Sequence, residues 1–325
     1  MTDPVTLVLA VSFQAFLQPD FWIGVAILAG TYGIFALGLQ LNVGFTGVLN
    51  FGQAGFMALG AYSMAILVVD VGWSFWLALP VATLIAMAAG LLIGLPSLRL
   101  RSDYLAIVTI AFAEMIRYTA QNARELTGGN QGLLGFDDDW ATLSLTMQDS
   151  LEGIGLGDNF LLPLAIVTWI LFGVLIFVLR RLTRSPWGRV LRAIREDEDA
   201  AAALGKNPLS YKLQSLAIAA ALGAISGYLL ALNLSFISPT QFEPLITFLG
   251  YAVLVLGGLA SYVGVALGAV VLLTLFEATR FLDLPLAAEQ VAALRFMLVG
   301  LVLILLMAFR PQGMLGKREE MVLGD

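Results

Sequence analysis

The sequence predicts an all-α, polytopic membrane protein with about nine transmembrane helices. Of the 325 residues, 59% are hydrophobic and 12% are charged, whereas an average soluble domain is about 45–50% apolar and about 25% charged. Long uncharged apolar runs recur along the chain, and a helical span needs about 20 such residues. These runs are continuous rather than alternating, which favours helices over a β-barrel. The composition therefore excludes a cytoplasmic enzyme.

The residue types that are missing narrow the chemistry further. The chain contains no Cys and no His. This excludes disulfides, Cys-ligated metals and catalytic triads that need a His or Cys partner, and it removes the commonest metal ligand and general base. We therefore expect no catalytic residue, no metal site and no cofactor.

The apolar runs fall into two groups. Six are long enough for a comfortable span, and three are short, broken by glycine or interrupted by charge. The first group comprises residues 21–41, 75–96, 160–180, 212–232, 262–281 and 293–309, and the second comprises residues 54–69, 103–120 and 245–259. The apolar run within residues 1–20 is too short to span, and these residues are expected to form an interfacial N-terminal segment.

Basic residues predict the orientation in the membrane, because cytoplasmic loops carry an excess of Lys and Arg. Residues 180–212 hold eight basic side chains, whereas residues 121–160 hold one against seven acidic ones. The basic stretch is therefore expected in the cytoplasm and the acidic one outside. The resulting division is an outer loop at residues 121–159, a cytoplasmic loop at 184–211 and a cytoplasmic tail at 310–325, within a membrane domain at 21–309. Nine crossings place the N-terminus outside.

A Gly-rich stretch, G-F-T-G-V-L-N-F-G-Q-A-G-F-M-A-L-G at residues 44–60, interrupts the apolar pattern. Each glycine weakens a helix by about 1 kcal/mol relative to alanine, and a bilayer tolerates broken backbone only where protein or a water-filled cavity covers it. One interpretation is a discontinuous helix lining a translocation path, with Asn50 and Gln53 as polar contacts. The alternative is close helix packing through small residues, as expected for the GxxxG spacings Gly90/Gly94, Gly223/Gly227 and Gly264/Gly268.

Two charged pairs fall inside predicted spans: Glu114 with Arg117, and Glu277 with Arg280. The i,i+3 spacing places each pair on one helix face, and a lone charge in hydrocarbon is costly, so pairing is expected. The residues around the two pairs are similar to each other: A-F-A-E-M-I-R-Y (111–118) and T-L-F-E-A-T-R-F (274–281). Two parallel, pseudo-symmetric halves of a transporter would produce such a repeat, and so would chance. Each pair is interpreted either as part of a gate on the outer side or as a structural ion pair at the interface.

The cytoplasmic stretch at residues 184–212 predicts two short helices. Ser185 and Pro186 suit the N-cap and first position of the first helix, whose apolar stripe is Val190, Leu191 and Ile194. The acidic residues 196–199 suit the start of a second helix, Ala200 to Leu204, because a helix N-terminus is its positive end, and Gly205 suits the C′ position. Bases followed by acids on an amphipathic loop favour a docking surface for a soluble partner. The alternative is a solvated, positive-inside anchor.

Six stretches together resemble the LivM-type permease subunit of branched-chain amino acid ABC importers. They are the Gly-rich run 44–62, G-L-P-S-L-R-L-R-S-D-Y-L-A-I-V-T-I-A-F-A-E-M-I-R (94–117), T-G-G-N-Q-G-L (127–133), S-P-W-G-R-V-L-R-A-I-R-E-D-E-D-A-A-A-A-L-G (185–205), G-G-L-A-S-Y-V-G-V-A-L-G-A (257–269) and F-R-P-Q-G-M-L-G (309–316). Their order and number extend the resemblance from about residue 30 to residue 316.

The resemblance implies a transport subunit of the bacterial inner (plasma) membrane with several partners. These would be a second homologous permease, two cytoplasmic ABC ATPase subunits that hydrolyse ATP, and a periplasmic or lipid-anchored amino acid-binding protein. The chain itself would be no enzyme, and its partners would include the lipid bilayer but no nucleic acid. The loop 185–205 matches the coupling segment of the family, so the residues that contact or frame the ATPase groove would be Gly188, Arg192, Glu196, Ala201 and Gly205.

Three other functions compete with import of leucine, isoleucine and valine. The same machinery carries urea, short amides or other neutral amino acids in related systems. An ion-gradient-driven secondary transporter would use Glu114 or Glu277 as its coupling group. A membrane scaffold would transport nothing. Candidate path or gate residues in the transport interpretations are Asn50, Gln53, Glu114, Arg117, Glu277 and Arg280.

Overall fold

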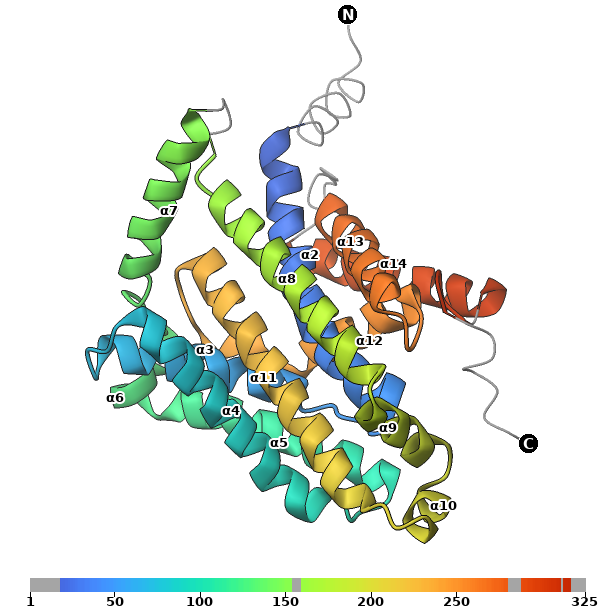
Figure 1. Cartoon of the computed structure of the whole chain (residues 1–325). Helices are drawn as coiled ribbons and strands as arrows, with labels where there is room; N and C mark the ends of the chain where they lie inside the picture. The colour runs from blue at the N-terminus through green and yellow to red at the C-terminus, as the bar shows by residue number, and fades with distance from the viewer. Residues whose placement is uncertain (1–17, 154–158, 280–287, 311, 317–325) are drawn as a thin grey trace, which may run out of the picture.

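The computed structural model describes residues 18–153, 159–279, 288–310 and 312–316, which fold into a bundle of helices (Figure 1). Within these ranges the only β-pairing is one isolated antiparallel bridge, between Leu133 and Ile237. The long helices are α2 (Pro19–Leu39), α3 (Gln53–Val69), α4 (Phe75–Ser97), α5 (Ser102–Asn122), α8 (Leu162–Thr183), α11 (Pro208–Leu234), α12 (Pro244–Gly257), α13 (Tyr262–Ala278) and α14 (Ala288–Phe309).

Shorter elements connect these helices. They are the π-helix η1 (Gln40–Thr46), α6 (Arg124–Thr127), the 3₁₀-helices η2 (Gly129–Gln131) and η3 (Pro239–Phe242), α7 (Asp138–Glu152), α9 (Pro186–Glu196) and α10 (Glu198–Ala203). The predicted interfacial segment at residues 1–20 lies, up to residue 17, outside the described residues.

Each of the nine predicted spans coincides with one of the long helices, which confirms the helical polytopic class. Four described segments are long and apolar enough to cross a membrane alone, and they are residues 19–46, α4, α8 and α11. Helices α12 and α13 reach this length only together, and they bend by 117° at the break between them. Length and composition of the described helices thus support four or five full spans. Of the remaining long helices, α3 is shorter and α5 carries charge.

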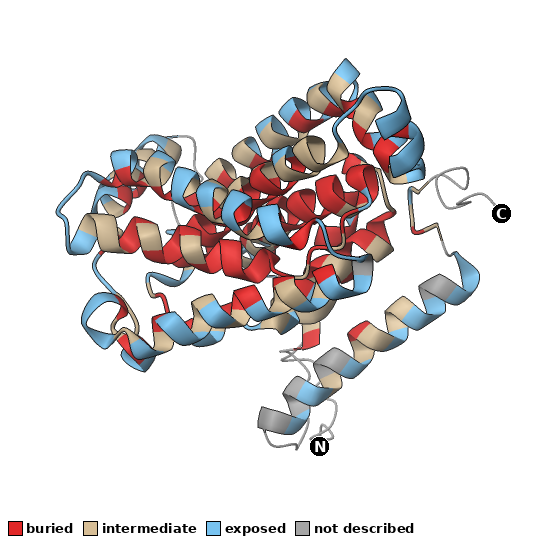
Figure 2. Cartoon of the chain, turned by 90° about the horizontal axis from the view of Figure 1, so that it is seen from below, coloured by how far each residue is buried: buried red, intermediate tan, exposed pale blue. Residues whose placement is uncertain are grey.

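The centre of the bundle is formed by α11 and by the continuous α2–η1 segment. In α11, 83% of the most apolar stretch is buried, and in α2–η1 the share is 72%, whereas in α4 and α8 it is 28% and 33%. Figure 2 shows the same gradient, with buried residues concentrated on the inner helices and exposed ones on the outer helices. The outer helices therefore present their apolar faces to lipid, as membrane-spanning helices do.

Glycines allow α3 and α11 to approach each other closely. A Cβ at Gly60 would lie 2.3 Å from the Cα of Ala224, and a Cβ at Gly227 would lie 2.2 Å from the carbonyl oxygen of Met57. On α13, a Cβ at Gly268 would lie 2.4 Å from the carbonyl oxygen of Val253 on α12. The GxxxG segments of α11 and α13 are therefore packing faces, as predicted, because such small residues let helix backbones meet.

The two loops of opposite charge lie at opposite ends of the bundle (Figure 1). Helix α7 of the acidic loop contacts the α3–α4 turn, where the Phe75 amide donates to Asp139 Oδ2 at 3.2 Å. Near the same end, Asn159 Nδ2 donates to Asp20 Oδ1 at 2.5 Å, so α2 begins on the acidic side. Helices α9 and α10 of the basic loop lie at the other end.

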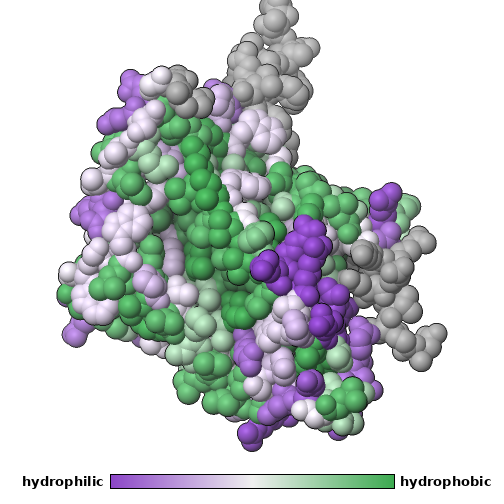
Figure 3. All heavy atoms as spheres, viewed as in Figure 1, coloured by the Kyte–Doolittle hydropathy of each residue, from purple (hydrophilic) through white to green (hydrophobic). Residues whose placement is uncertain are grey.

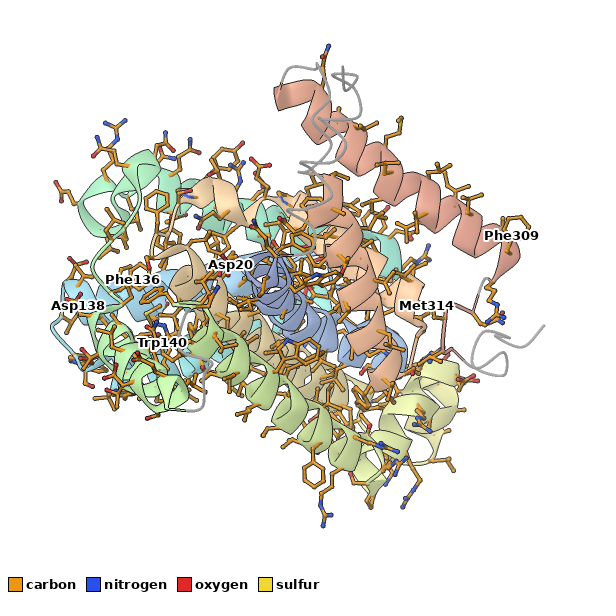
Figure 4. The ribbon with its side chains drawn as sticks, turned by 90° about the horizontal axis from the view of Figure 1, so that it is seen from above. Asp20, Phe136, Asp138, Trp140, Phe309 and Met314 are labelled. Carbon is orange, nitrogen blue, oxygen red and sulfur yellow. The ribbon has the colours of Figure 1, made fainter. Side chains whose placement is uncertain are left out.

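The end of the chain returns to the bundle after α14. Figure 4 shows α14 beside the bundle, with Phe309 at its far end and Met314 back towards the other helices. The Met314 amide donates to the Leu256 carbonyl at 2.9 Å, and the Leu315 amide donates to the Gly257 carbonyl at 3.0 Å. Residues 312–316 thereby cap the end of α12, next to the bend before α13.

The α3–α11 contact predicts a sharp difference between two glycine substitutions. Gly60→Val forces a side chain into the Ala224 backbone, so it should destabilise the protein by about 1–3 kcal/mol or more. Gly173→Val is the matched control, because a Cβ at Gly173 on exposed α8 meets nothing within 4 Å. Thermal unfolding of both variants in the same detergent measures the difference. Equal melting temperatures would contradict the close α3–α11 packing.

Candidate functional site

Helix α9 of the basic loop lies against the end of α8 through one face. Pro186 is its first residue and Ser185 occupies the N-cap position, as predicted, although the Ser185 hydroxyl donates to the Leu182 carbonyl at 2.7 Å and caps no amide. The buried residues of α9 are Gly188, Leu191 and Ile194. A Cβ at Gly188 would lie 2.1 Å from the carbonyl oxygen of Thr183 in the last turn of α8. Glycine at this position therefore sets how closely the two helices approach.

Helix α10 follows after one extended residue and has defined caps at both ends. Asp197 Oδ1 accepts from the Ala200 amide at 2.9 Å and caps its N-terminus. At the C-terminus, Gly205 has a φ of 77° and its amide donates to Ala202, while the Lys206 amide donates to Ala201. This pair of bonds is a Schellman motif, so the predicted C′ role of Gly205 is confirmed. The helix spans Glu198–Ala203, starting two residues before the predicted Ala200.

Side chains tie both short helices to the membrane helix α11. Trp187 Nε1 of α9 donates to Gln214 Oε1 at 2.8 Å, and Lys212 forms an ion pair with Glu198 of α10. Ala201 on α10 is buried. Helices α9 and α10 are thus fixed to the bundle and form a compact projection, which, with the turn that follows, we call the lever (residues 186–205).

The lever also contacts the Gly-rich stretch, which sequence analysis treats as a separate feature. Arg195 Nη1 donates to the carbonyl oxygen of Gly44 at 2.5 Å, across 151 residues of chain. The next glycine, Gly47, adopts a φ of 75°, and a Cβ there would lie 3.3 Å from Arg195 Cγ. Helix α9 therefore lies directly on the end of η1, at the point where the α2–η1 segment ends.

Other residues of the lever and its end face solvent. Arg192 is exposed, with its guanidinium 5.3 Å from the ring centroid of Phe45. Glu196 is also exposed. Leu204, directly after α10, is 81% exposed. The lever combines this apolar residue with charged neighbours.

The break between η1 and α3 is confirmed as a discontinuity, and its two predicted polar residues are fully buried. Asn50 Nδ2 donates to Gln53 Oε1 at 3.1 Å, and Asn50 Oδ1 accepts from the Gly52 amide at 2.9 Å. Gln53 Nε2 donates to the Ala219 carbonyl of α11 at 2.8 Å. Asn50 and Gln53 therefore contact each other, and Gln53 also contacts α11. Neither residue lines the cavities at Glu277 or at the end of α8.

Three side chains from other helices form hydrogen bonds with backbone groups of this break that have no partner within a helix. The Phe51 amide donates to Thr109 Oγ1 of α5 at 3.1 Å, and the Ala54 amide donates to Thr247 Oγ1 of α12 at 3.2 Å. Tyr251 OH donates to the Asn50 carbonyl at 2.8 Å. Sequence reasoning missed Thr109, Thr247 and Tyr251, because a single hydroxyl in an apolar helix gives no local sign of its distant partner.

Glu114 and Arg117 form the predicted ion pair on α5. Arg117 Nε donates to Glu114 Oε1 at 2.9 Å, and Arg117 Nη2 donates to Glu114 Oε2 at 2.6 Å. The Arg117 side chain is 15% exposed and the Glu114 side chain 24%, and the guanidinium also lies 4.5 Å from the Tyr118 ring centroid. This bidentate geometry neutralises both charges at one face of a membrane helix.

The second predicted pair lies on and after α13. Glu277 lines a cavity of about 280 Å³ between α2, α12 and α13, together with Tyr32 and Glu243 and with apolar side chains. Arg280 lies outside the described residues. The structure therefore places Glu277 away from Glu114 and in a different setting, at the wall of a cavity.

Comparison with known proteins agrees with the sequence resemblance. A family model described as the branched-chain amino acid transport system permease component matches residues 21–307. The chain is 36% identical to the high-affinity branched-chain amino acid transport system permease protein LivM of Escherichia coli (strain K12), over 95% of this chain and 73% of that protein. It is 27% identical to the probable branched-chain amino acid transport permease protein LivM of Methanocaldococcus jannaschii, over 89% of this chain and 91% of the relative.

A second kind of permease is also similar to the chain. The high-affinity branched-chain amino acid transport system permease protein LivH of Escherichia coli (strain K12) is 27% identical over 94% of this chain and 97% of that protein. No solved structure matches the chain at a significant level. The family model covers most of the chain, and the alignment with Escherichia coli LivM covers 95% of it. The chain therefore belongs to the family of branched-chain amino acid transport system permease components.

Proposed function

We propose that this chain is the membrane-spanning permease subunit of an ATP-driven importer for branched-chain amino acids in the bacterial inner membrane. The observation that carries the proposal is the lever, which is fixed to α8 and α11 and contacts the broken helix through Arg195 and Gly44. Separate ATPase subunits bind and hydrolyse ATP, and their movement is passed through the lever to the membrane helices. The chain itself makes and breaks no covalent bond.

The exposed surface of the lever is the ATPase docking site. Leu204 supplies an exposed apolar contact, and Glu196 supplies a charge beside it. Gly188, Ala201 and Gly205 act differently, because they hold the two helices of the lever in place. Arg192 lies against the Phe45 ring at the base of the lever. Of the five residues proposed for coupling, Glu196 therefore touches the motor and the other four frame its contact.

The partners of this subunit occupy three other surfaces. A second homologous permease faces the exposed side of α5, where Tyr104, Ile107, Met115 and Tyr118 follow helical spacing beside the Glu114–Arg117 pair. A charged pair is better accommodated at a protein surface or a polar path than against lipid. The similarity of the chain to both LivM and LivH supports such a pairing. A periplasmic or lipid-anchored binding protein delivers the amino acid from the side of α7.

The domain division follows from these roles. Residues 21–309 are the permease domain, with 121–159 as the periplasmic loop and 184–211 as the cytoplasmic coupling loop. Residues 1–20 are the interfacial segment and residues 310–325 the cytoplasmic tail. Along the path, Asn50 and Gln53 join helices at the break, while Glu114 with Arg117, and Glu277 with Arg280, stand at the outer gate.

The cavity lined by Glu243 and Glu277 favours one alternative function, that of a transporter driven by an ion gradient. Glu243 and Glu277 share that cavity with apolar side chains, and acidic residues within membrane helices commonly carry coupling ions. Uptake of radiolabelled leucine into proteoliposomes decides between the two functions. The ATP-driven function requires that uptake needs the ATPase subunits and ATP. Gradient-driven uptake by this chain alone would contradict it.

Two substitutions in the lever should uncouple ATP hydrolysis from transport. Glu196→Lys reverses an exposed charge, and Gly205→Pro is incompatible with a φ of 77° and removes an amide that donates to Ala202. We expect uptake to fall by roughly tenfold, the scale of a contact worth a little over 1 kcal/mol, with the permease still inserted. Glu152→Lys makes the same charge change at the opposite end, on α7, and should leave uptake unchanged. Full uptake in both lever variants would refute the docking role.

The contact between lever and broken helix predicts a different defect. Arg195→Met removes the bond to the Gly44 carbonyl while leaving the exposed surface of the lever intact. ATPase binding should persist, and transport per ATP hydrolysed should fall by roughly tenfold, because hydrogen bonds to charged groups contribute about 1.5–3 kcal/mol. Arg99→Met, at an exposed arginine of the α4–α5 turn, is the control. Unaltered transport per ATP in Arg195→Met would show that the lever acts by another route.

A further inference from the structure

A cavity at the cytoplasmic end of the bundle is lined by three arginines. It has a volume of about 310 Å³, lies between α8, α9 and the start of α13, and includes Arg180, Arg184 and Arg192. A neighbouring hollow of about 550 Å³ shares Arg180 and Arg184 and adds Arg181. Among the residues that the structure describes, no carboxylate lines either of them. Figure 3 shows strongly hydrophilic side chains grouped where α8 ends.

These arginines lack an acidic partner in the part of the chain that the structure describes, where the ion pairs found join Glu114 to Arg117 and Glu198 to Lys212. Arg192 is held near the Phe45 ring, so its guanidinium is directed by packing. The guanidinium groups of Arg180, Arg181 and Arg184 at the end of α8 and of Arg192 on α9 repel one another unless an anion neutralises them. The site therefore has the chemistry of an anion site, and guanidinium suits phosphate because it donates two parallel hydrogen bonds.

The surface that leads to the arginines is apolar. Ile170, Val174 and Phe177 of α8 are 62%, 51% and 66% exposed, and their spacing places them on one side of the helix. Phe177 also lines the second hollow, and Ile176 and Val263 line the first. In Figure 3, a continuous hydrophobic surface borders the hydrophilic group at the end of α8. An apolar strip that ends in arginines matches the two parts of a phospholipid.

We propose that this arginine-lined cavity binds the phosphate headgroup of an anionic phospholipid of the cytoplasmic leaflet, with its acyl chains along α8. The depth is suitable, because Arg180 lies in the last turn of the membrane-spanning helix α8 and Arg184 follows it, on the side that carries the positive charge excess. Basic pockets between membrane helices on this side recognise such headgroups. The bound lipid would bridge α8 and α9 through Arg180, Arg184 and Arg192, and so would hold the base of the lever at the membrane surface.

Lipid binding is measured on the full-length chain, with any subunits that copurify, by native mass spectrometry in detergent. The probes are dioleoyl-phosphatidylglycerol and dioleoyl-phosphatidylcholine. The test variant is Arg180→Gln/Arg184→Gln, and the matched control is Arg99→Gln/Arg189→Gln, which removes the same charge from exposed cytoplasmic positions outside the cavity. Circular dichroism and thermal melting establish that both variants fold.

The proposal expects the phosphatidylglycerol adduct to exceed the phosphatidylcholine adduct, and to weaken by roughly tenfold or more in the cavity variant but not in the control. It is overturned if both lipids bind equally, if the cavity variant binds like the wild type, or if both variants lose binding alike. Displacement of the lipid by millimolar inorganic phosphate would assign the site to free phosphate. Displacement by docked ATPase subunits would assign the arginines to that interface. Either result rejects the lipid.

Discussion

The need to satisfy every backbone polar group inside a bilayer shapes the centre of this protein. Where η1 ends and α3 has not begun, amides and carbonyls lose their helical partners. Thr109, Thr247 and Tyr251 from α5 and α12 supply the missing hydrogen bonds, and Gln53 adds a bond to α11. One break in one helix thereby holds four helices together, and the rest of the bundle is arranged around it.

The break and the lever are in contact and form one connected unit rather than two separate sites. Helix α9 rests on the end of α8 at Gly188 and reaches the end of η1 through Arg195. A few residues further on, the hydrogen-bonded break joins α3, α5, α11 and α12. The lever therefore contacts the segment at which the membrane helices are interconnected. This arrangement suits a subunit that converts the movement of a soluble motor into a rearrangement of helices.

Local features were predictable from the sequence, and contacts between distant segments were not. The glycines at 44–60 predicted a discontinuous helix, the i,i+3 spacing predicted the Glu114–Arg117 pair, and Gly205 predicted the end of α10. Each rests on neighbours within one turn or on backbone conformation. The Arg195–Gly44 contact and the hydroxyl partners of the break depend on which helices meet, and a single sequence does not show that. The bend between α12 and α13 was missed for a related reason, since Ala260 adopts a φ of 57° without being a glycine.

Residues 312–316 link the end of α12 to the arginine-lined cavity. They close the end of α12 through two backbone hydrogen bonds and contribute Leu315 to the wall of that cavity beside α9. Because one short segment does both, a change of angle at the bend between α12 and α13 alters the shape of the cavity as well.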